Sequence, residues 1–261
     1  MHPNSALGIT LTPLLDAVKQ AGEKILEIYK TDFEVEFKGD ESPLTSADKA
    51  ANEVLMEYVK THTPEIPVIS EENKEVAYSE RKDWERFWLI DPLDGTKEFI
   101  KKNGEFTVNI ALIINGSPEL GVVYRPTEGT TFLGISKEGS WKIDDNQSTK
   151  LTGGKHYSEL DSIKVVASRS HLSDDVVKFV DDLKSKGKKV DFVSAGSSLK
   201  FCLVAEGLAD VYPRLGPTME WDTGAAHAVA LGVGRNVTIA ENGAQLVYNK
   251  ENLLNPFFIV A

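Results

Sequence analysis

Two aspartates lie close together in a short stretch whose sequence predicts a strand followed by a turn. Residues 88–96 read WLIDPLDGT, so Asp91 and Asp94 are separated by a Pro-Leu pair. We expect the strand to end at Asp91, because the proline that follows has no amide hydrogen for a central sheet ladder and restricts the residue before it. Asp94 and Gly95 would then form a tight turn. Two carboxylates and the Leu93 carbonyl around one point are oxygen ligands that suit a hard divalent cation, above all Mg²⁺.

The same turn predicts a helix start with free backbone amides. A helix beginning at Thr96 would aim the amides of Gly95 and Thr96 at the point that the carboxylates surround. Amides at a helix start suit a phosphate oxygen. The alternative is an ordinary surface turn with two solvated aspartates.

Three further acidic residues stand beside predicted elements. Glu71 and Glu72 follow the apolar run 66–69, and Asp222 precedes the small residues 223–226. Taken alone, adjacent glutamates are usually solvated surface, and an aspartate before small residues is usually a helix N-cap. Four carboxylates gathered in one cleft would repel one another unless cations neutralised them.

The N-terminal part of the chain predicts two helices. Apolar residues recur every three or four positions from Pro13 to Tyr29, behind Thr12 as a cap. A second helix opens near Thr45 or Ser46 and places Asp48 in its first turn. The helix dipole favours a carboxylate there.

The next part predicts strands. The apolar runs 66–69 and 87–90 each lead directly into acidic residues, so they would deliver charge to a sheet edge. Residues 106–143 are rich in β-formers and are interrupted by Gly and Pro at turn positions, which indicates an antiparallel meander.

The polar stretch 144–154 is the best candidate for a boundary, and we predict halves at residues 1–150 and 151–261. The first half would hold the antiparallel sheet and most metal ligands. The second would be an alternating α/β half. Its strands and helices are expected in turn at residues 163–167, 173–186, 190–193, 197–206, 210–212, 222–231, 237–240 and 257–260.

Composition narrows the function. The chain has 261 residues, is 41% hydrophobic and carries a formal net charge of −11, so it can bury a core but has no general attraction to nucleic acid or to an anionic membrane. Cys202 is the only cysteine, which fits a reducing compartment. No signal peptide and no membrane-spanning run is found, so we expect a cytoplasmic protein. The residues leave the oligomeric state and peripheral association with the inner membrane open.

The order and spacing of the acidic motifs resemble those of a known family. Glu71-Glu72, the DPLDGT run at 91–96 and the distant Trp221-Asp222 pair together resemble the inositol monophosphatase superfamily of lithium-sensitive, Mg²⁺-dependent phosphatases. The resemblance extends over nearly the whole chain. It implies an α/β fold of the α+β kind, built as a layered α/β/α/β/α sandwich.

Within that superfamily the chain looks similar to the bacterial 3'(2'),5'-bisphosphate nucleotidases. The segments that carry this narrower resemblance are 42–48, 167–171, 196–202, 212–214 and 221–222. The resemblance implies hydrolysis of adenosine 3',5'-bisphosphate to AMP and phosphate, and a role in recycling the by-product of sulfate assimilation.

The resemblance also implies roles at the metal site, which would hold two or three Mg²⁺ ions. The implied metal ligands are Glu71, Asp91, the Leu93 carbonyl, Asp94 and Asp222. Thr96 and Asp48 would polarise or position the attacking water. Whether Glu71 or Asp48 accepts the proton of this water stays open.

Further positions are implied to contact the substrate. The amides of Gly95 and Thr96 would hold the scissile phosphate, and Asp222 would lie against the substrate as well. His171 would lie beside the adenine. The implied contacts to the phosphate that is not cleaved are Ser197, Lys200 and Arg214.

The expected reaction is in-line attack by water with Mg²⁺ assistance, which needs no nucleophilic side chain. This agrees with a lone Cys202 in an apolar run. The rival substrates are an inositol monophosphate and fructose 1,6-bisphosphate. A rival of another class is a non-catalytic nucleotide or cation sensor, which would not need Thr96 and Asp48. A calcium-binding EF-hand is weaker, because residues 91–102 lack its alternating ligands.

Overall fold

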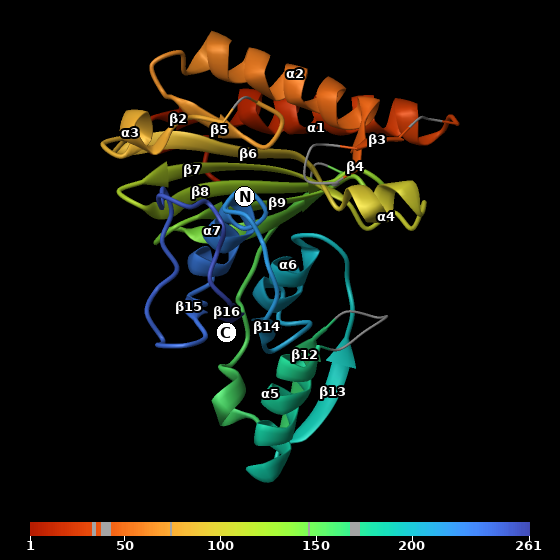
Figure 1. Cartoon of the computed structure of the whole chain (residues 1–261), viewed down its shortest axis with the longest axis vertical. Coiled ribbons are helices and arrows are strands. Elements are labelled where there is room, and N and C mark those ends of the chain that lie inside the picture. Colours follow the sequence, from red (N-terminus) through yellow and green to blue (C-terminus); the bar gives the residue numbers. More distant parts are fainter. Residues whose placement is uncertain (33–34, 38–42, 74, 146, 168–172) are drawn as a thin grey trace.

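A seven-stranded sheet forms the centre of the molecule, with helices on both of its faces (Figure 1). The structure is a computed structural model. It describes residues 1–32, 35–37, 43–73, 75–145, 147–167 and 173–261. The strand order is β11-β10-β9-β8-β7-β6-β5. The strands are β5 (Val68–Ser70), β6 (Arg86–Asp94), β7 (Thr107–Ile114), β8 (Ser117–Arg125), β9 (Thr130–Ile135), β10 (Gly139–Asp144) and β11 (Gln147–Lys150).

The meander predicted for residues 106–143 is confirmed. Strands β6 to β11 pair antiparallel with their neighbours in sequence, and only β5 joins its neighbour β6 in parallel. The polar stretch begins at the end of β10 and includes the edge strand β11. The division into two halves at residue 150 stays a prediction.

Strand β6 runs further than its sequence predicts. The prediction that it ends at Asp91 is wrong, because β6 continues to Asp94 and pairs with β7 on both sides of Pro92. The register shifts between Asp91 and Asp94, which marks a bulge. A bulge leaves a residue outside the hydrogen-bond ladder, so it tolerates a proline and re-aims the side chains around it.

Two helices, α1 (Leu11–Tyr29) and α2 (Ser46–His62), cover one face of the sheet. Helix α1 starts two residues before the predicted Pro13, with Thr10 as its cap, because Leu11 is apolar and completely buried. Helix α2 begins as predicted. Its cap Thr45 and Asp48 form a reciprocal capping box, which satisfies otherwise unpaired amides at the helix start.

The opposite face is covered by α7 (Gly224–Gly232), which packs closely against the sheet. Two glycines allow this approach. A Cβ atom at Gly121 would lie 2.2 Å from the Ala225 carbonyl oxygen, and one at Gly134 would lie 2.4 Å from the Val229 amide. A larger residue at either of these two positions would push α7 and the turn before it away from the sheet.

The C-terminal part adds small sheets and helices on the α7 side of the central sheet. A parallel pair joins β12 and β13, and an antiparallel sheet has the order β14-β16-β15. The elements are the 3₁₀ helix Tyr157–Glu159, β12 (Ser162–Val166), α5 (Asp174–Ser185), β13 (Lys189–Val193), α6 (Leu199–Ala205), β14 (Tyr212–Arg214), β15 (Val237–Ile239) and β16 (Phe258–Val260). The remaining short elements are β1 (Ser5–Ala6), β2 (Ile9–Thr10), β3 (Val35–Phe37), β4 (Pro43–Thr45), α3 (Tyr78–Arg81) and α4 (Thr96–Ile100).

Three predicted C-terminal elements are displaced along the chain. The helix predicted from residue 197 starts at Leu199, because Ser197 has a left-handed φ of 54° that a helix does not accept. The helix predicted from Asp222 starts at Gly224, because a turn closed by the Thr223 and Gly224 amides on the Glu220 carbonyl precedes it. The strand predicted at 210–212 lies at 212–214.

No helix in the described ranges combines the length and the apolar character that a bilayer crossing requires.

Candidate active site

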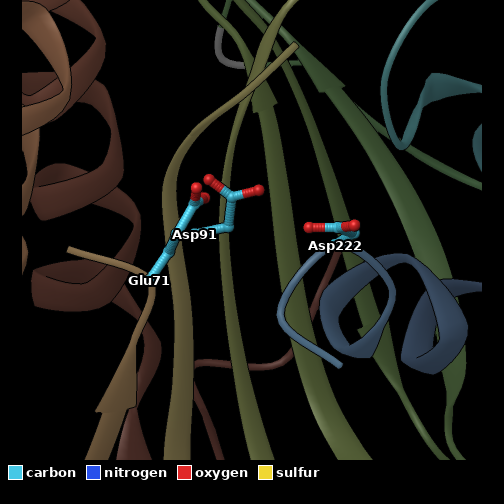
Figure 2. A group of neighbouring side chains, drawn as sticks. All are labelled: Glu71, Asp91 and Asp222. Atoms are coloured by element: carbon cyan, nitrogen blue, oxygen red, sulfur yellow. The ribbon is translucent and has the colours of Figure 1, made fainter. Parts of the chain in front are cut away.

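Three carboxylates from distant parts of the chain meet at one edge of the central sheet (Figure 2). Glu71 follows β5, Asp91 lies in β6, and Asp222 lies in the turn before α7. One oxygen of each lies within 4.8 Å of the others. The parallel pairing of β5 and β6 explains why Glu71 reaches Asp91, since parallel strands end at the same sheet edge.

The charges in this cluster oppose one another. Burial raises the pKa of Asp91 well above its usual range, and the neighbouring charges of Glu71, Asp94 and Asp222 raise it further. Burial and then Asp94 raise the pKa of Asp222 to about 8. Carboxylates that resist ionisation together, with oxygens converging on one point, fit a hard divalent cation, which would neutralise them.

Asp94 faces a different set of partners. Its Oδ2 accepts hydrogen bonds from the Ser197 hydroxyl at 2.5 Å and from the Ser198 amide at 2.6 Å. Burial raises its pKa, while these two donors and the charges of Lys200 and Arg214 oppose the rise. Asp94 therefore lies near enough to influence Asp91 and Asp222 electrostatically, yet its hydrogen bonds come from Ser197 and Ser198. Its role as a metal ligand stays a prediction.

Thr96 and Asp48 meet beside the cluster. The Thr96 hydroxyl lies 3.4 Å from Asp48 Oδ1 and 3.3 Å from the Leu93 carbonyl oxygen. The other Asp48 oxygen accepts the amide and the hydroxyl of Thr45, both at 2.7 Å. Burial raises the pKa of Asp48, and the charge of Glu72 adds to the rise. This buried carboxylate is thus fixed by the start of α2 and directed toward Thr96.

The turn after β6 has the backbone geometry that a glycine favours. Gly95 has a φ of 92°. A Cβ atom there would lie 3.1 Å from the Glu105 carbonyl oxygen and 3.3 Å from Ser197 Cβ. A side chain at position 95 would therefore strain the turn and crowd Ser197. The Ser197 hydroxyl donates to Asp94, which directly precedes Gly95.

A cavity of 690 Å³ opens beside the carboxylates and has a basic wall. Asp94, Asp222 and Gly95 line it together with Lys200 and Arg214, the two residues that form this basic wall. The Arg214 Nη2 donates to the Pro217 carbonyl at 2.8 Å, but its buried Nε has no hydrogen-bond partner within the described ranges. A buried guanidinium N–H without a partner is costly, so a bound anion would satisfy it.

Sequence reasoning missed several residues of the site. Lys97 in α4 and Lys101 directly after it also line the cavity. The spacing of four residues after the DPLDGT turn was the available signal. Thr107 and Asn109 on β7 were missed as well. Thr107 bonds the hydroxyls of Ser197 and Ser198, and Asn109 accepts from Ser198, so both brace the partners of Asp94.

The predicted site residues are therefore largely brought together. Glu71, Asp91 and Asp222 meet directly, and Thr96 contacts Asp48. Of the predicted substrate contacts, those that line the cavity are Gly95, Ser197, Lys200, Arg214 and Asp222. His171, predicted beside the adenine, lies outside the described residues.

Comparison with known proteins gives matches along almost the full chain. The sequence pattern of the inositol monophosphatase family matches residues 10–256. A 3'(2'),5'-bisphosphate nucleotidase CysQ of Salmonella typhimurium is 44% identical over 253 residues, covering 96% of this chain and 98% of that protein. The CysQ nucleotidase of Escherichia coli K12 is 43% identical over 254 residues, covering 96% and 99%. The crystal structure of CysQ from Bacteroides thetaiotaomicron superposes with a TM-score of 0.84 at 43% identity, covering 98% of each chain.

Proposed function

This chain belongs to the inositol monophosphatase family, and from that premise we propose that it is a Mg²⁺-dependent 3'(2'),5'-bisphosphate nucleotidase. Its reaction would release the 3'-phosphate of adenosine 3',5'-bisphosphate and leave AMP. The 43–44% identity to the CysQ nucleotidases over almost the full chain supports this substrate class.

One observation carries the proposal. The carboxylates of Glu71, Asp91 and Asp222 converge beside a cavity that Asp222 lines together with Lys200 and Arg214. A substrate with two phosphates needs two anion sites. The metal edge would receive the phosphate that is cleaved, and the basic wall would receive the phosphate that is kept.

The carboxylate edge would hold two or three Mg²⁺ ions through Glu71, Asp91, Asp222, Asp94 and the Leu93 carbonyl. When bound, Mg²⁺ supplies charge neutralisation for the phosphate and a lowered pKa for the attacking water. The chain itself supplies positioning. The left-handed turn at Gly95 presents its amide and that of Thr96 to the scissile phosphate.

Thr96 and Asp48 would guide the proton of the attacking water. The Thr96 hydroxyl can donate to Asp48 Oδ1 and accept from a water at the metal edge. The raised pKa of Asp48 makes this carboxylate a better proton acceptor than an ordinary aspartate. We therefore assign the proton to Asp48 rather than to Glu71, which the metal would occupy.

The basic wall would hold the second phosphate by charge and by hydrogen bonds. Arg214 offers its Nε, which has no hydrogen-bond partner among the described residues, and Lys200 Nζ lies 3.3 Å from the Ser197 carbonyl oxygen and 5.9 Å from the centroid of the Tyr212 ring. Ser197 would connect the two anion sites, because its hydroxyl donates to Asp94 and its carbonyl accepts from Lys200 Nζ.

The test is phosphate release from three substrates, each with Mg²⁺ and with a chelator. We expect rapid release from adenosine 3',5'-bisphosphate, slow release from inositol 1-phosphate and fructose 1,6-bisphosphate, and none with the chelator. Faster release from inositol 1-phosphate would keep the metal chemistry and overturn the assignment of the basic wall. No release from any of them, with Mg²⁺ still bound, would favour a sensor.

A further inference from the structure

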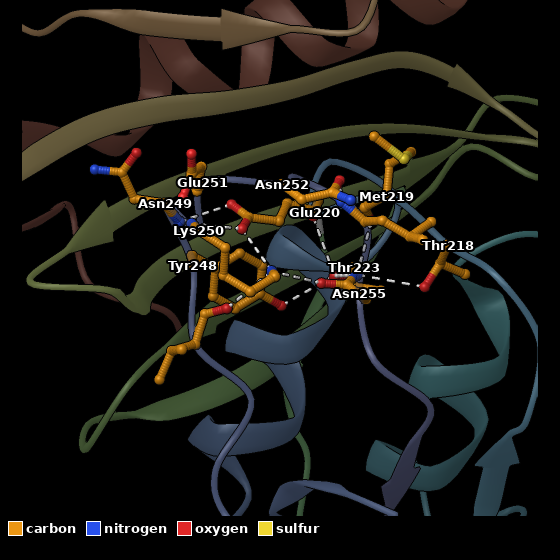
Figure 3. Close-up of polar contacts among 12 residues, drawn as sticks. Thr218, Met219, Glu220, Thr223, Tyr248, Asn249, Lys250, Glu251, Asn252 and Asn255 are labelled. Atoms are coloured by element: carbon orange, nitrogen blue, oxygen red, sulfur yellow. Dashed lines mark hydrogen bonds and ion pairs between the residues drawn. The ribbon is translucent and has the colours of Figure 1, made fainter. Parts of the chain in front are cut away.

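A further carboxylate, Glu220, lies two residues before Asp222 and points toward Asn249 and Lys250 (Figure 3). It is completely buried. Its Oε2 accepts the Asn249 amide at 2.8 Å, and its Oε1 accepts the Lys250 amide at 3.0 Å and the Lys250 Nζ at 2.5 Å. The turn that carries Asp222 is thereby joined to the loop at residues 248–255.

The same loop also forms hydrogen bonds with residues on either side of Asp222. Lys250 Nζ donates to Asn255 Oδ1 at 3.0 Å. The Asn255 amide group then donates to the Met219 carbonyl at 2.9 Å and to the Thr223 hydroxyl at 3.1 Å. The Met219 amide in turn donates to Asp222 Oδ2 at 2.9 Å. These buried and part-buried hydrogen bonds link Glu220 to the residues on either side of Asp222, and the Met219 amide holds the Asp222 carboxylate.

The other end of this network reaches the segment that follows Glu71. Arg81, 1% exposed, donates its Nη1 to Asn249 Oδ1 at 2.9 Å and to the Lys250 carbonyl at 2.7 Å. Its Nε donates to the Val76 carbonyl at 3.2 Å, and the Asn249 amide group returns a bond to the Arg81 carbonyl at 2.7 Å. The network thus joins α3 to the Asp222 turn.

Stability alone does not account for such a network. A buried ion pair such as Glu220–Lys250 costs much of what it gains in desolvation, and an apolar replacement of similar volume is often as stable. What the network provides is a fixed turn for Asp222, one of three carboxylates whose oxygens lie within 4.8 Å of one another. Like charges at this distance repel, so a restraint on the turn keeps Asp222 in place when no cation neutralises them.

We propose that Glu220 is a positioning residue which, through Lys250 and Asn255, fixes the turn that carries Asp222 and so sets the affinity of the site for its divalent cation. This inference rests on the metal site of the proposed function but not on the identity of the substrate. Groups that orient metal ligands commonly change metal affinity by about 10–100-fold when they are removed.

The first variant is Glu220→Gln, which keeps the shape and the acceptor oxygen but removes the charge paired with Lys250. Mg²⁺ binding is measured by calorimetry on the full chain without substrate, and Mg²⁺ activation is measured with substrate. We expect binding about tenfold weaker. We expect the half-activating Mg²⁺ concentration to rise by the same factor, while kcat at saturating Mg²⁺ stays within about twofold, since the ligands themselves are intact.

A matched control separates positioning from stability. Thr63→Val removes another buried hydrogen bond, from the Trp88 indole at 3.0 Å, under α2 on the opposite face of the sheet. It should lower Tm and leave Mg²⁺ affinity unchanged. The double variant Glu220→Gln, Lys250→Met removes both charges, so it should recover Tm while its Mg²⁺ affinity stays low. This variant also keeps the test open if Glu220→Gln alone folds poorly.

Two outcomes would overturn the proposal. One is wild-type Mg²⁺ affinity in Glu220→Gln or in the double variant. The other is an equal loss of affinity in Thr63→Val at matched Tm, which would make the effect one of general stability. Calorimetry also separates this proposal from the proposed function. The Mg²⁺ affinities of the wild type and of Glu220→Gln can be compared even if the chain cleaves none of the three substrates.

Discussion

The two walls of the cavity are built in different ways. The carboxylates of the acidic edge lie on the central sheet and in its adjoining turns. Asp91 is 1% exposed, and one of its oxygens lies within 4.8 Å of an oxygen of Glu71 and of Asp222. The basic wall is half-buried, and its cations have few partners of their own. Rigid elements hold groups more accurately than loops do. The contrast supports the proposal that the acidic edge carries the bond-breaking chemistry and that the basic wall selects the substrate.

Strand β6 contains the same contrast within four residues. Asp91 is surrounded by other carboxylates, whereas Asp94 accepts two hydrogen bonds and faces two cations. The register of β6 shifts between them, and a bulge re-aims the side chains around it. One strand end thus presents two carboxylates with different partners.

The largest expected effect comes from the acidic edge. Asp91→Asn should lower kcat/KM by about a thousandfold or more, because several kcal/mol of charge stabilisation depend on the metal. The free energy of unfolding of the metal-free protein should rise, since a neutral amide ends the repulsion with Glu71 and Asp222. Steady-state kinetics and denaturant unfolding measure both. Asp210→Asn, outside the site, serves as the control, and near-normal activity in Asp91→Asn would remove the edge from the mechanism.

The same repulsion predicts an unusual pH dependence of stability. The folded-state pKa of Asp222 is raised to about 8, so the folded chain binds this proton more tightly than the unfolded chain does. The free energy of unfolding of metal-free protein should therefore fall as pH rises from about 4 to about 8, by up to about 1.4 kcal/mol per pH unit for one such carboxyl. Saturating Mg²⁺ should abolish or reverse the trend, because it binds the ionised form.

Urea unfolding in chelator at pH 5.5 and pH 8 measures this difference. Asp222→Asn should flatten the profile without Mg²⁺. If the wild-type chain is as stable at pH 8 as at pH 5.5 in chelator, the carboxylates of the acidic edge do not repel as the structure indicates.

On the basic wall the expected effect is smaller and falls on binding. Arg214→Gln should raise KM for adenosine 3',5'-bisphosphate by about 10–100-fold, since a hydrogen bond to a charged group contributes about 1.5–3 kcal/mol, and should leave kcat nearly unchanged. The same variant should cleave 3'-AMP, which has no second phosphate, as well as wild type does. An equal loss on both substrates would place Arg214 with the acidic edge instead.

The two walls also differ in how far the sequence predicts them. The acidic edge was predictable, because each carboxylate follows an apolar strand or precedes a run of small residues, and strand ends meet at a sheet edge. The exact strand end was not, because whether a proline ends a strand or lies in a bulge depends on pairing with β7, a tertiary contact. The buried role of Glu220 was hidden for the same reason. Its partners Asn249 and Lys250 are distant in sequence, so local spacing does not indicate them.

The smallest effect tests the lysines that sequence reasoning missed. Lys101 is exposed and lines the cavity, while the adjacent Lys102 donates to the Tyr29 and Thr31 carbonyls at 3.0 and 3.1 Å. Lys101→Gln should raise KM for the bisphosphate about two- to fivefold at low salt and less at 0.5 M salt, because solvent and ions screen an exposed charge. Lys102→Gln removes the same charge one residue away and should leave KM unchanged. If both variants weaken binding equally, the net charge of the surface attracts the substrate, and the basic wall ends at Lys200 and Arg214. If only Lys101→Gln does, the wall extends along α4 to the turn that carries Asp94, and the two walls share one short helix.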